Sequence, residues 1–271
     1  MLSQIRHWHA PLASAGLQRA LGIAAVLAFW QVASTFGLNS YYVSSPLAIA
    51  DQIAQWTASG YIWPHLVATL TNMMLGFTLA AAAAVSFALL LGSSDLLGRV
   101  FGPLVFVAYS TPKAVLAPLL IVWIGIGRPP VIALAFLSSF FVVFFNVYEG
   151  VRNVPQAYIN TAAILGANTW NTAIKFRLPA AALFVASGLH QGLIYAFHGT
   201  ILGEMTASDT GIGYIIIYSA TAMDSTAVLA GLAILGGISY ALVRLLKVAL
   251  EVDEIARNNV PGGRFSFAFP G

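Results

Sequence analysis

Six long apolar runs dominate this sequence and leave few folds open to it. They extend over residues 17–38, 65–92, 101–126, 129–148, 180–205 and 225–249. A helix needs about 20 apolar residues to cross the roughly 30 Å hydrocarbon core of a bilayer. Lipid offers the backbone no hydrogen-bond partners, so spanning segments must be helices or closed barrels, and these runs lack the alternation of barrel strands. The sequence therefore predicts an all-α, polytopic membrane protein with six transmembrane helices.

The composition excludes the main soluble alternatives. Only 8% of the residues are charged, whereas soluble globular domains average about 25%. Cysteine is absent, which excludes a disulfide scaffold and a thiolate metal site. The formal net charge of +3 comes mostly from basic residues placed between apolar runs. That placement indicates membrane topology and not a nucleic-acid partner.

The basic residues also predict the orientation of the chain, with both termini in the cytoplasm. In that orientation the outer loops hold only Arg128. The inner side then holds Arg6, Arg19, Arg99, Arg152, Lys175, Arg177, Arg244, Lys247, Arg257 and Arg264. Basic residues favour the cytoplasmic side of membrane proteins. We expect a cytoplasmic segment 1–16, a membrane domain 17–249 and a cytoplasmic tail 250–271; the first run exceeds the apolar core of a signal peptide and is expected to be retained.

Two shorter segments are expected at the outer surface. After Pro46, apolar side chains recur at helical spacing up to Trp56, which predicts an amphipathic helix. Its apolar face serves either packing or a partner, and packing is favoured. In segment 206–219, two glycines precede an apolar run that is too short to cross the bilayer. This pattern favours a re-entrant or surface helix.

The segment 150–179 is predicted to be a long cytoplasmic loop with two short helices. Pro155 suits the start of the first helix and Gly166 its left-handed end, while Asn168 or Thr169 can cap the second and Pro179 can stop it. The loop is rich in apolar residues, namely Ile159, Ala162, Ala163, Leu165, Trp170, Ile174 and Phe176. So much apolar surface fits a docking partner better than a solvated linker.

At this loop the sequence resembles the membrane subunits of binding-protein-dependent ABC importers, and among them the nitrate/sulfonate/taurine-type permeases. The family signature is Glu-Ala-Ala, three residues, Gly, and later Leu-Pro. Here Asn160-Thr161-Ala162 stands at the first three positions, Gly166 at the glycine and Leu178-Pro179 at the close. Two of the first three residues depart from the signature. The resemblance implies that these six residues couple the chain to an ATPase.

The resemblance continues from about residue 45 to 246 through an ordered series that includes Pro112-Lys113-Ala114, Glu204 and Gly211-Ile212-Gly213-Tyr214. It implies a type I ABC importer permease fold in the bacterial cytoplasmic (inner) membrane. The implied partners are a second permease subunit, identical or not, two ABC ATPases and a periplasmic or extracellular solute-binding protein. The chain has no P-loop pattern, so we expect no cofactor on it, with ATP and Mg bound by the ATPase. It is expected not to be an enzyme.

Polar residues inside the apolar runs are the candidates for a translocation path. Lys113 lies about twelve residues, roughly 18 Å, into the third run, beside a kink expected at Pro112. It can attract an anionic solute, or it can snorkel or pair inside the bundle, and both interpretations stay open. Glu204 lies near an outer end, where structural pairing is expected.

The fifth run carries a polar stripe. Ser187, Gln191, Tyr195 and His198 share one helical face, with His190 at its flank. Such a stripe either lines a cavity or makes hydrogen bonds between helices, and the cavity is favoured. The histidines lack the spacing of a metal site, and no metal is expected.

The leading hypothesis is a permease subunit of an ATP-driven importer for a small polar, anionic solute of the nitrate, sulfonate or taurine class. The alternative is an ion-coupled secondary transporter or a channel. Those proteins usually carry carboxylates in mid-membrane, whereas Glu149 and Glu204 lie near the ends of runs. An intramembrane hydrolase fits less well, because no serine has the context of a nucleophile motif.

Overall fold

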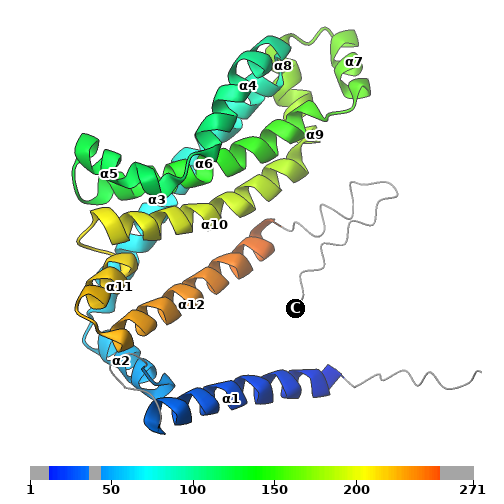
Figure 1. The fold of residues 1–271 in the computed structure, drawn as a ribbon. Coiled ribbons are helices and arrows are strands. Elements are labelled where there is room, and N and C mark those ends of the chain that lie inside the picture. The colour runs from blue at the N-terminus through cyan, green and yellow to red at the C-terminus, as the bar shows by residue number, and fades with distance from the viewer. Residues whose placement is uncertain (1–11, 37–43, 251–271) are drawn as a thin grey trace, which may run out of the picture.

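The computed structural model describes residues 12–36 and 44–250, and it contains helices without any strand in these residues (Figure 1). The elements are α1 (Leu12–Phe36), α2 (Pro46–Ala58), α3 (Ile62–Gly92), α4 (Asp95–Ser110), α5 (Lys113–Ile124), α6 (Arg128–Arg152), α7 (Gln156–Ile164), α8 (Thr169–Thr172), the π-helix η1 (Ala173–Arg177), α9 (Leu178–Ala180), α10 (Ala182–Ala207), α11 (Ile212–Thr221) and α12 (Ser225–Leu250). The predicted all-α class is confirmed. Most of the predicted terminal segments, with Arg6, Arg257 and Arg264, lies outside the described residues.

Four of the described helices are long and apolar enough to cross a membrane alone. They are α1, α3, α6 and α12. Two further spans are bent helix pairs: α4 meets α5 at 92°, and the stretch Thr169–Ala180 meets α10 at 73°. The described residues therefore reach six spans, as predicted, when each bent pair counts as one.

The third predicted span is a broken helix pair and not the kinked helix that the sequence predicts. Ser94 caps α4 by accepting a hydrogen bond from the Leu97 N–H, and α4 ends at Ser110. Thr111 and Pro112 are extended, and α5 restarts at Lys113. Proline cannot donate to the preceding turn and pushes the residue before it out of the helical region. The expected kink is a full break, so the depth of Lys113 reckoned along a straight helix is also wrong.

The packed core consists of α3, α6 and α10. Small residues let these helices approach closely, as in other helix bundles of membranes. A Cβ built on Gly76 of α3 would lie 2.5 Å from the Ala135 Cβ of α6, and one on Gly199 of α10 would lie 2.5 Å from the Leu134 carbonyl oxygen. Any side chain at these two glycines would force the helices apart. This core holds the break of α4–α5 and the loop between α6 and α10 in fixed positions.

The connecting helices gather at two opposite ends of the bundle (Figure 1). At one end lie α2, α11 and the junction of α5 with α6, while α7, α8 and α9 lie at the other. The two expected outer helices are confirmed as elements: Ser45 caps α2 by accepting from the Ala48 N–H at 3.2 Å, and α11 follows Gly211. The predicted outer and cytoplasmic segments are thus separated as the topology requires.

Candidate functional sites

The first candidate site is the loop between α6 and α10. After α7 the chain reverses at Gly166, whose φ of +70° suits glycine better than other residues. The N–H of Ala167 donates to the Ala162 carbonyl at 2.9 Å and closes this turn. Asn168 then caps α8 by accepting from the Asn171 N–H at 2.8 Å. The two predicted helices, the left-handed turn and the asparagine cap are confirmed.

Pro179 does not stop the second helix of this loop, which corrects the prediction. The chain continues from α8 through the π-helix η1 and α9 before it bends at Ala181. Pro179 stands in the first turn of α9, where the missing N–H costs little. The Leu178 side chain packs against the buried cluster between α3 and α6. Leu178 and Pro179 therefore lie at the joint between the loop and α10.

The other predicted coupling residues fall into two groups. Asn160, Thr161 and Gly166 are exposed on the projecting loop. Ala162 is fully buried, because α7 turns it against the loop itself. Its small side chain holds the loop together and offers no surface to a partner, which revises the interpretation of Ala162 as a contact residue.

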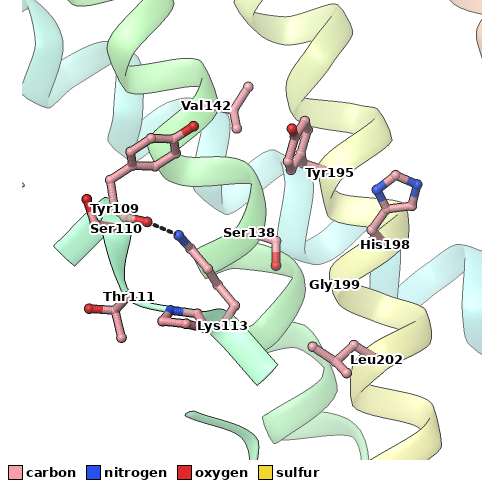
Figure 2. Close-up of a pocket in the computed structure, with 11 residues that line it drawn as sticks. Tyr109, Ser110, Thr111, Lys113, Ser138, Val142, Tyr195, His198, Gly199 and Leu202 are labelled. Atoms are coloured by element: carbon pink, nitrogen blue, oxygen red, sulfur yellow. Dashed lines mark hydrogen bonds between the residues drawn. The ribbon is translucent and has the colours of Figure 1, made fainter. Parts of the chain in front are cut away.

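The second candidate site is a cavity of about 360 Å³ at the α4–α5 break (Figure 2). It lies between that break, α6 and α10. Its lining consists of Tyr109, Ser110, Thr111, Pro112, Lys113, Ser138, Val142, Tyr195, His198, Gly199 and Leu202. Lys113 of the third predicted run therefore meets Tyr195 and His198 of the fifth run at this cavity.

Lys113 is held at this cavity by the helix that precedes it. Its ammonium group donates to the Tyr109 carbonyl oxygen, as Figure 2 shows. The ammonium nitrogen also lies 4.8 Å from the centre of the Tyr109 ring and 5.1 Å from that of Phe141. These contacts suit a cation, because aromatic faces attract positive charge. The lysine is both tethered and able to present its charge to the cavity.

The rest of the polar stripe on α10 lies beyond the cavity. Gln191 is exposed, and its amide donates weakly to the Ser187 hydroxyl at 3.4 Å, within the same helix. His190 is half-buried beside them. Within the described residues no group of three His, Cys, Asp or Glu side chains is placed to hold a metal ion. The structure thus divides a stripe that the sequence presents as continuous.

A third polar group surrounds Glu204 and joins three helices. Glu204 is fully buried, and one of its carboxylate oxygens accepts from the Thr69 hydroxyl at 3.0 Å and from the Gly213 N–H at 2.9 Å. The Ile212 N–H donates to the Thr69 hydroxyl oxygen at 2.9 Å. A Cβ on Gly211 would collide with the Glu204 carboxylate. We call Thr69, Glu204, Gly211, Ile212 and Gly213 the glutamate cluster. The pairing of Glu204 is structural, as expected, and its hydrogen-bond donors are neutral groups.

Comparison with known proteins decides which family this architecture represents. Residues 76–250 match the family described as "Binding-protein-dependent transport system inner membrane component". The chain belongs to this family. The permease identity predicted from the sequence is confirmed, with an inner-membrane location. Membership implies an ATPase and a solute-binding protein as partners, and ATP hydrolysis belongs to the separate ATPase chain.

Individual relatives of this permease cover most of its length. A "Probable ABC transporter permease protein" of Haemophilus influenzae is 33% identical over 83% of this chain and 92% of its own. The riboflavin transport system permease protein RibX of Chloroflexus aurantiacus is 30% identical, over 82% of this chain and 84% of its own. The taurine transport system permease protein TauC of Escherichia coli is 26% identical, over 87% of this chain and 88% of its own.

Solved structures of the MetNI methionine ABC transporter share the fold of this permease. One of them, in an inward-facing conformation, matches with a TM-score of 0.57 at 19% identity. The match covers 72% of this chain and 93% of the solved chain. The predicted importer permease fold is confirmed by this likeness.

Proposed function

We propose that this permease forms one half of a translocation path for a small polar, anionic solute that contains nitrogen or sulfur. The observation that carries the proposal is the cavity at the α4–α5 break, where Lys113 meets Tyr195 and His198. The cavity lining includes no carboxylate. An ammonium group in an apolar setting favours anions, because nearby charges interact more strongly there than in water.

A second permease subunit, identical or related, completes this path in the proposal. Tyr109 and Tyr195 at the cavity are 40% and 45% exposed. The neighbouring side chains Phe106, Val107 and Val115 are exposed as well. A single chain thus supplies one wall of a path, and apolar surface of this extent needs either lipid or a second subunit to cover it.

The loop between α6 and α10 couples this path to the ATPase, which binds ATP and Mg. Asn160, Thr161 and Gly166 offer surface to the ATPase, while Ala162 holds the loop in shape. Leu178 and Pro179 connect the loop to α10 at the 73° bend. Because α10 also lines the cavity, movement of the loop reaches the path through one helix.

The class of solute rests on Lys113 and on the likeness to the taurine permease. The riboflavin permease is more similar in sequence, so a polar heterocycle is the competing class. Uptake assays distinguish the anion from the heterocycle. They use vesicles that contain the permease, its ATPase and its binding protein, and they test taurine, aliphatic sulfonates, nitrate and riboflavin in turn. We expect ATP-dependent uptake of an anion. Uptake driven by an ion gradient without ATP would overturn the proposal in favour of a secondary transporter.

Both termini are proposed to be cytoplasmic. The chain contains no cysteine, so single cysteines can be introduced at Gly127, Asp209 and Gly166. An impermeant thiol reagent added outside should label the first two positions only. External labelling at Gly166 would show that the topology is the reverse of the one proposed. The coupling loop would then lie on the side of the membrane away from the ATPase.

A further inference from the structure

A second pocket, of about 210 Å³, lies where the end of α3 meets the loop between α6 and α10. Its polar lining consists of Ser93, which follows α3, and of Thr169, Thr172 and Arg177 from the loop. The rest of the lining is apolar and comes from α7 and the turn after it. One water takes up about 30 Å³ in the liquid, so the pocket has room for a group of several heavy atoms. It shares no lining residue with the cavity beside Lys113.

Arg177 brings a positive charge to this pocket, and no carboxylate balances it. The residue is half-buried. Within the described part of the chain, the one ion pair joins Arg152 to Asp95 at 3.5 Å, and neither residue lines the pocket. The loop itself offers no acid, because residues 153–174 contain no Asp or Glu. Charges removed from water are usually paired, and an anion in the pocket would supply the missing counter-charge.

The end of α3 holds the Arg177 side chain at the pocket. One guanidinium nitrogen donates to the Gly92 carbonyl oxygen at 2.8 Å. This bond satisfies a carbonyl at the negative end of α3, but it uses only one of the several N–H donors of the guanidinium group. Those donors form a rigid planar fork that matches the oxygen atoms of a phosphate group.

Three hydroxyl groups complete the polar lining. The Ser93 hydroxyl oxygen is buried and has no hydrogen-bond partner among the described residues, which is rare for a buried polar atom. Thr172 is half-buried and Thr169 is exposed. Each hydroxyl can donate a hydrogen bond. Because the lining combines a guanidinium group with three hydroxyls and has no carboxylate, it suits an oxyanion better than a metal ion or an ammonium group.

The position of the pocket along α3 puts it within reach of lipid headgroups. This helix has 31 residues and is therefore about 46 Å long at about 1.5 Å per residue. The hydrocarbon core is about 30 Å thick. When the middle of α3 spans that core, the pocket at its end lies at the level of the headgroups or in the water beyond them.

We propose that this pocket binds one phosphate-type oxyanion, held by Arg177 and by the hydroxyls of Ser93, Thr169 and Thr172. The bound anion joins the end of α3 to the loop between α6 and α10. Free inorganic phosphate and the headgroup of an anionic phospholipid offer the same chemistry to these residues. The site lies outside the proposed translocation path and does not depend on which solute the permease carries.

The test measures phosphate binding to the full-length permease in a maltoside detergent and a phosphate-free buffer. The ATPase is left out so that no nucleotide site contributes. We expect saturable binding of radiolabelled inorganic phosphate, about one per chain, at millimolar concentrations, and a rise in the thermal unfolding temperature with phosphate. Absence of saturable binding of both inorganic phosphate and phospholipid would overturn the inference.

A matched pair of variants tests the role of Arg177. Arg177→Gln should weaken phosphate binding at least tenfold, because it removes the charge and the fork. Lys175→Gln removes the same charge at an exposed residue outside the lining and should change binding less than about twofold. Equal losses in the two variants would indicate attraction by surface charge alone and overturn the site.

The hydroxyl groups provide a second test, which also serves if Arg177→Gln unfolds after losing its bond to Gly92. Ser93→Ala and Thr172→Val should each weaken phosphate binding about fivefold, the worth of one hydrogen bond of about 1 kcal/mol. Thr172→Val keeps the volume of the side chain. Unchanged phosphate binding by both variants, each folded by its thermal unfolding curve, would contradict the proposed lining.

Native mass spectrometry distinguishes the two sources of the anion. Phosphatidylglycerol is added to the same preparation, and a diacyl glycolipid without phosphate is the control. Retention of phosphatidylglycerol that excess inorganic phosphate displaces, and that Arg177→Gln loses, would identify the lipid headgroup as the occupant. Binding of inorganic phosphate without retention of this lipid would identify the free anion. Equal retention of the glycolipid and phosphatidylglycerol, both unaffected by Arg177→Gln, would exclude the headgroup, and the site would then rest on inorganic phosphate alone.

Discussion

Glu204 and Lys113 both place an ionisable group inside an apolar helix bundle, but they are held in different ways. Glu204 is fully buried, and its partners come from α3 and α11. Lys113 is half-buried, and its hydrogen bond goes to Tyr109, one helix earlier in the chain. Partners from distant elements fix a group as part of the fold, whereas a local tether leaves the group available to a solute.

The surroundings of the two residues strengthen this contrast. Around Glu204 the space is full, since neither Gly211 nor Gly213 has room for a side chain. Around Lys113 there is a cavity of about 360 Å³. We therefore expect substitutions in the glutamate cluster to change stability and those around Lys113 to change transport.

The largest effect is expected for Glu204→Leu. The substitution removes the acceptor of Thr69 and of the Gly213 N–H, and each unsatisfied buried group costs about 1–3 kcal/mol. The thermal unfolding temperature in detergent should fall markedly, together with the yield of assembled transporter. Glu149→Gln, at an exposed carboxylate on α6, is the control and should unfold like the unchanged protein. If Glu204→Leu were as stable as this control, the glutamate cluster would not secure the fold.

Gly211→Ala tests the same cluster from its other side. The φ of +108° disfavours any side chain, and the new Cβ would collide with the Glu204 carboxylate. We expect a loss of stability of about 1–3 kcal/mol, the usual cost of strained backbone, measured by thermal unfolding. Gly102→Ala is the matched control, because nothing lies within 4 Å of that position. Equal unfolding temperatures for the two variants would contradict close packing at Gly211.

These two sites also show what the sequence can predict. Apolar runs predict the helices because span length is fixed by the thickness of the bilayer. The partner of Glu204 is Thr69, 135 positions away, and no spacing rule connects such residues. The burial of Ala162 likewise depends on how α7 folds against the loop. The ordered motif series already contains Glu204 and Gly211-Ile212-Gly213, but not the contacts that these residues make.

The break at Thr111 and Pro112 could be predicted only in part: its position follows from the sequence, but its angle does not. Proline in an apolar run predicts a kink, and the sequence places it correctly. The angle of 92° depends on how α5 packs against α6, where Ala117 and Leu120 meet Leu134. Local rules therefore locate the break, and packing between distant helices sets its size.

Lys113→Met should change transport and leave the fold intact. It removes the ammonium group from the cavity while keeping most of the side-chain volume. We expect uptake of an anionic solute to slow about tenfold, equivalent to about 1.4 kcal/mol in the barrier, at saturating binding protein. Lys113→Arg, which keeps the charge, should slow uptake less. Unchanged uptake by Lys113→Met would assign the lysine a structural role, like that of Glu204.

The smallest effects should separate the two parts of the stripe on α10. His198 lines the cavity and Gln191 does not, although the sequence puts both on one face. His198→Leu removes one polar contact to solute, and at about 1 kcal/mol per intramembrane hydrogen bond it should slow uptake roughly fivefold. Gln191→Leu loses only a weak bond within its own helix and should change uptake by less than about twofold. If both variants were equally slow, the path would follow the whole exposed face of α10, and the cavity beside Lys113 would be only one stage of it.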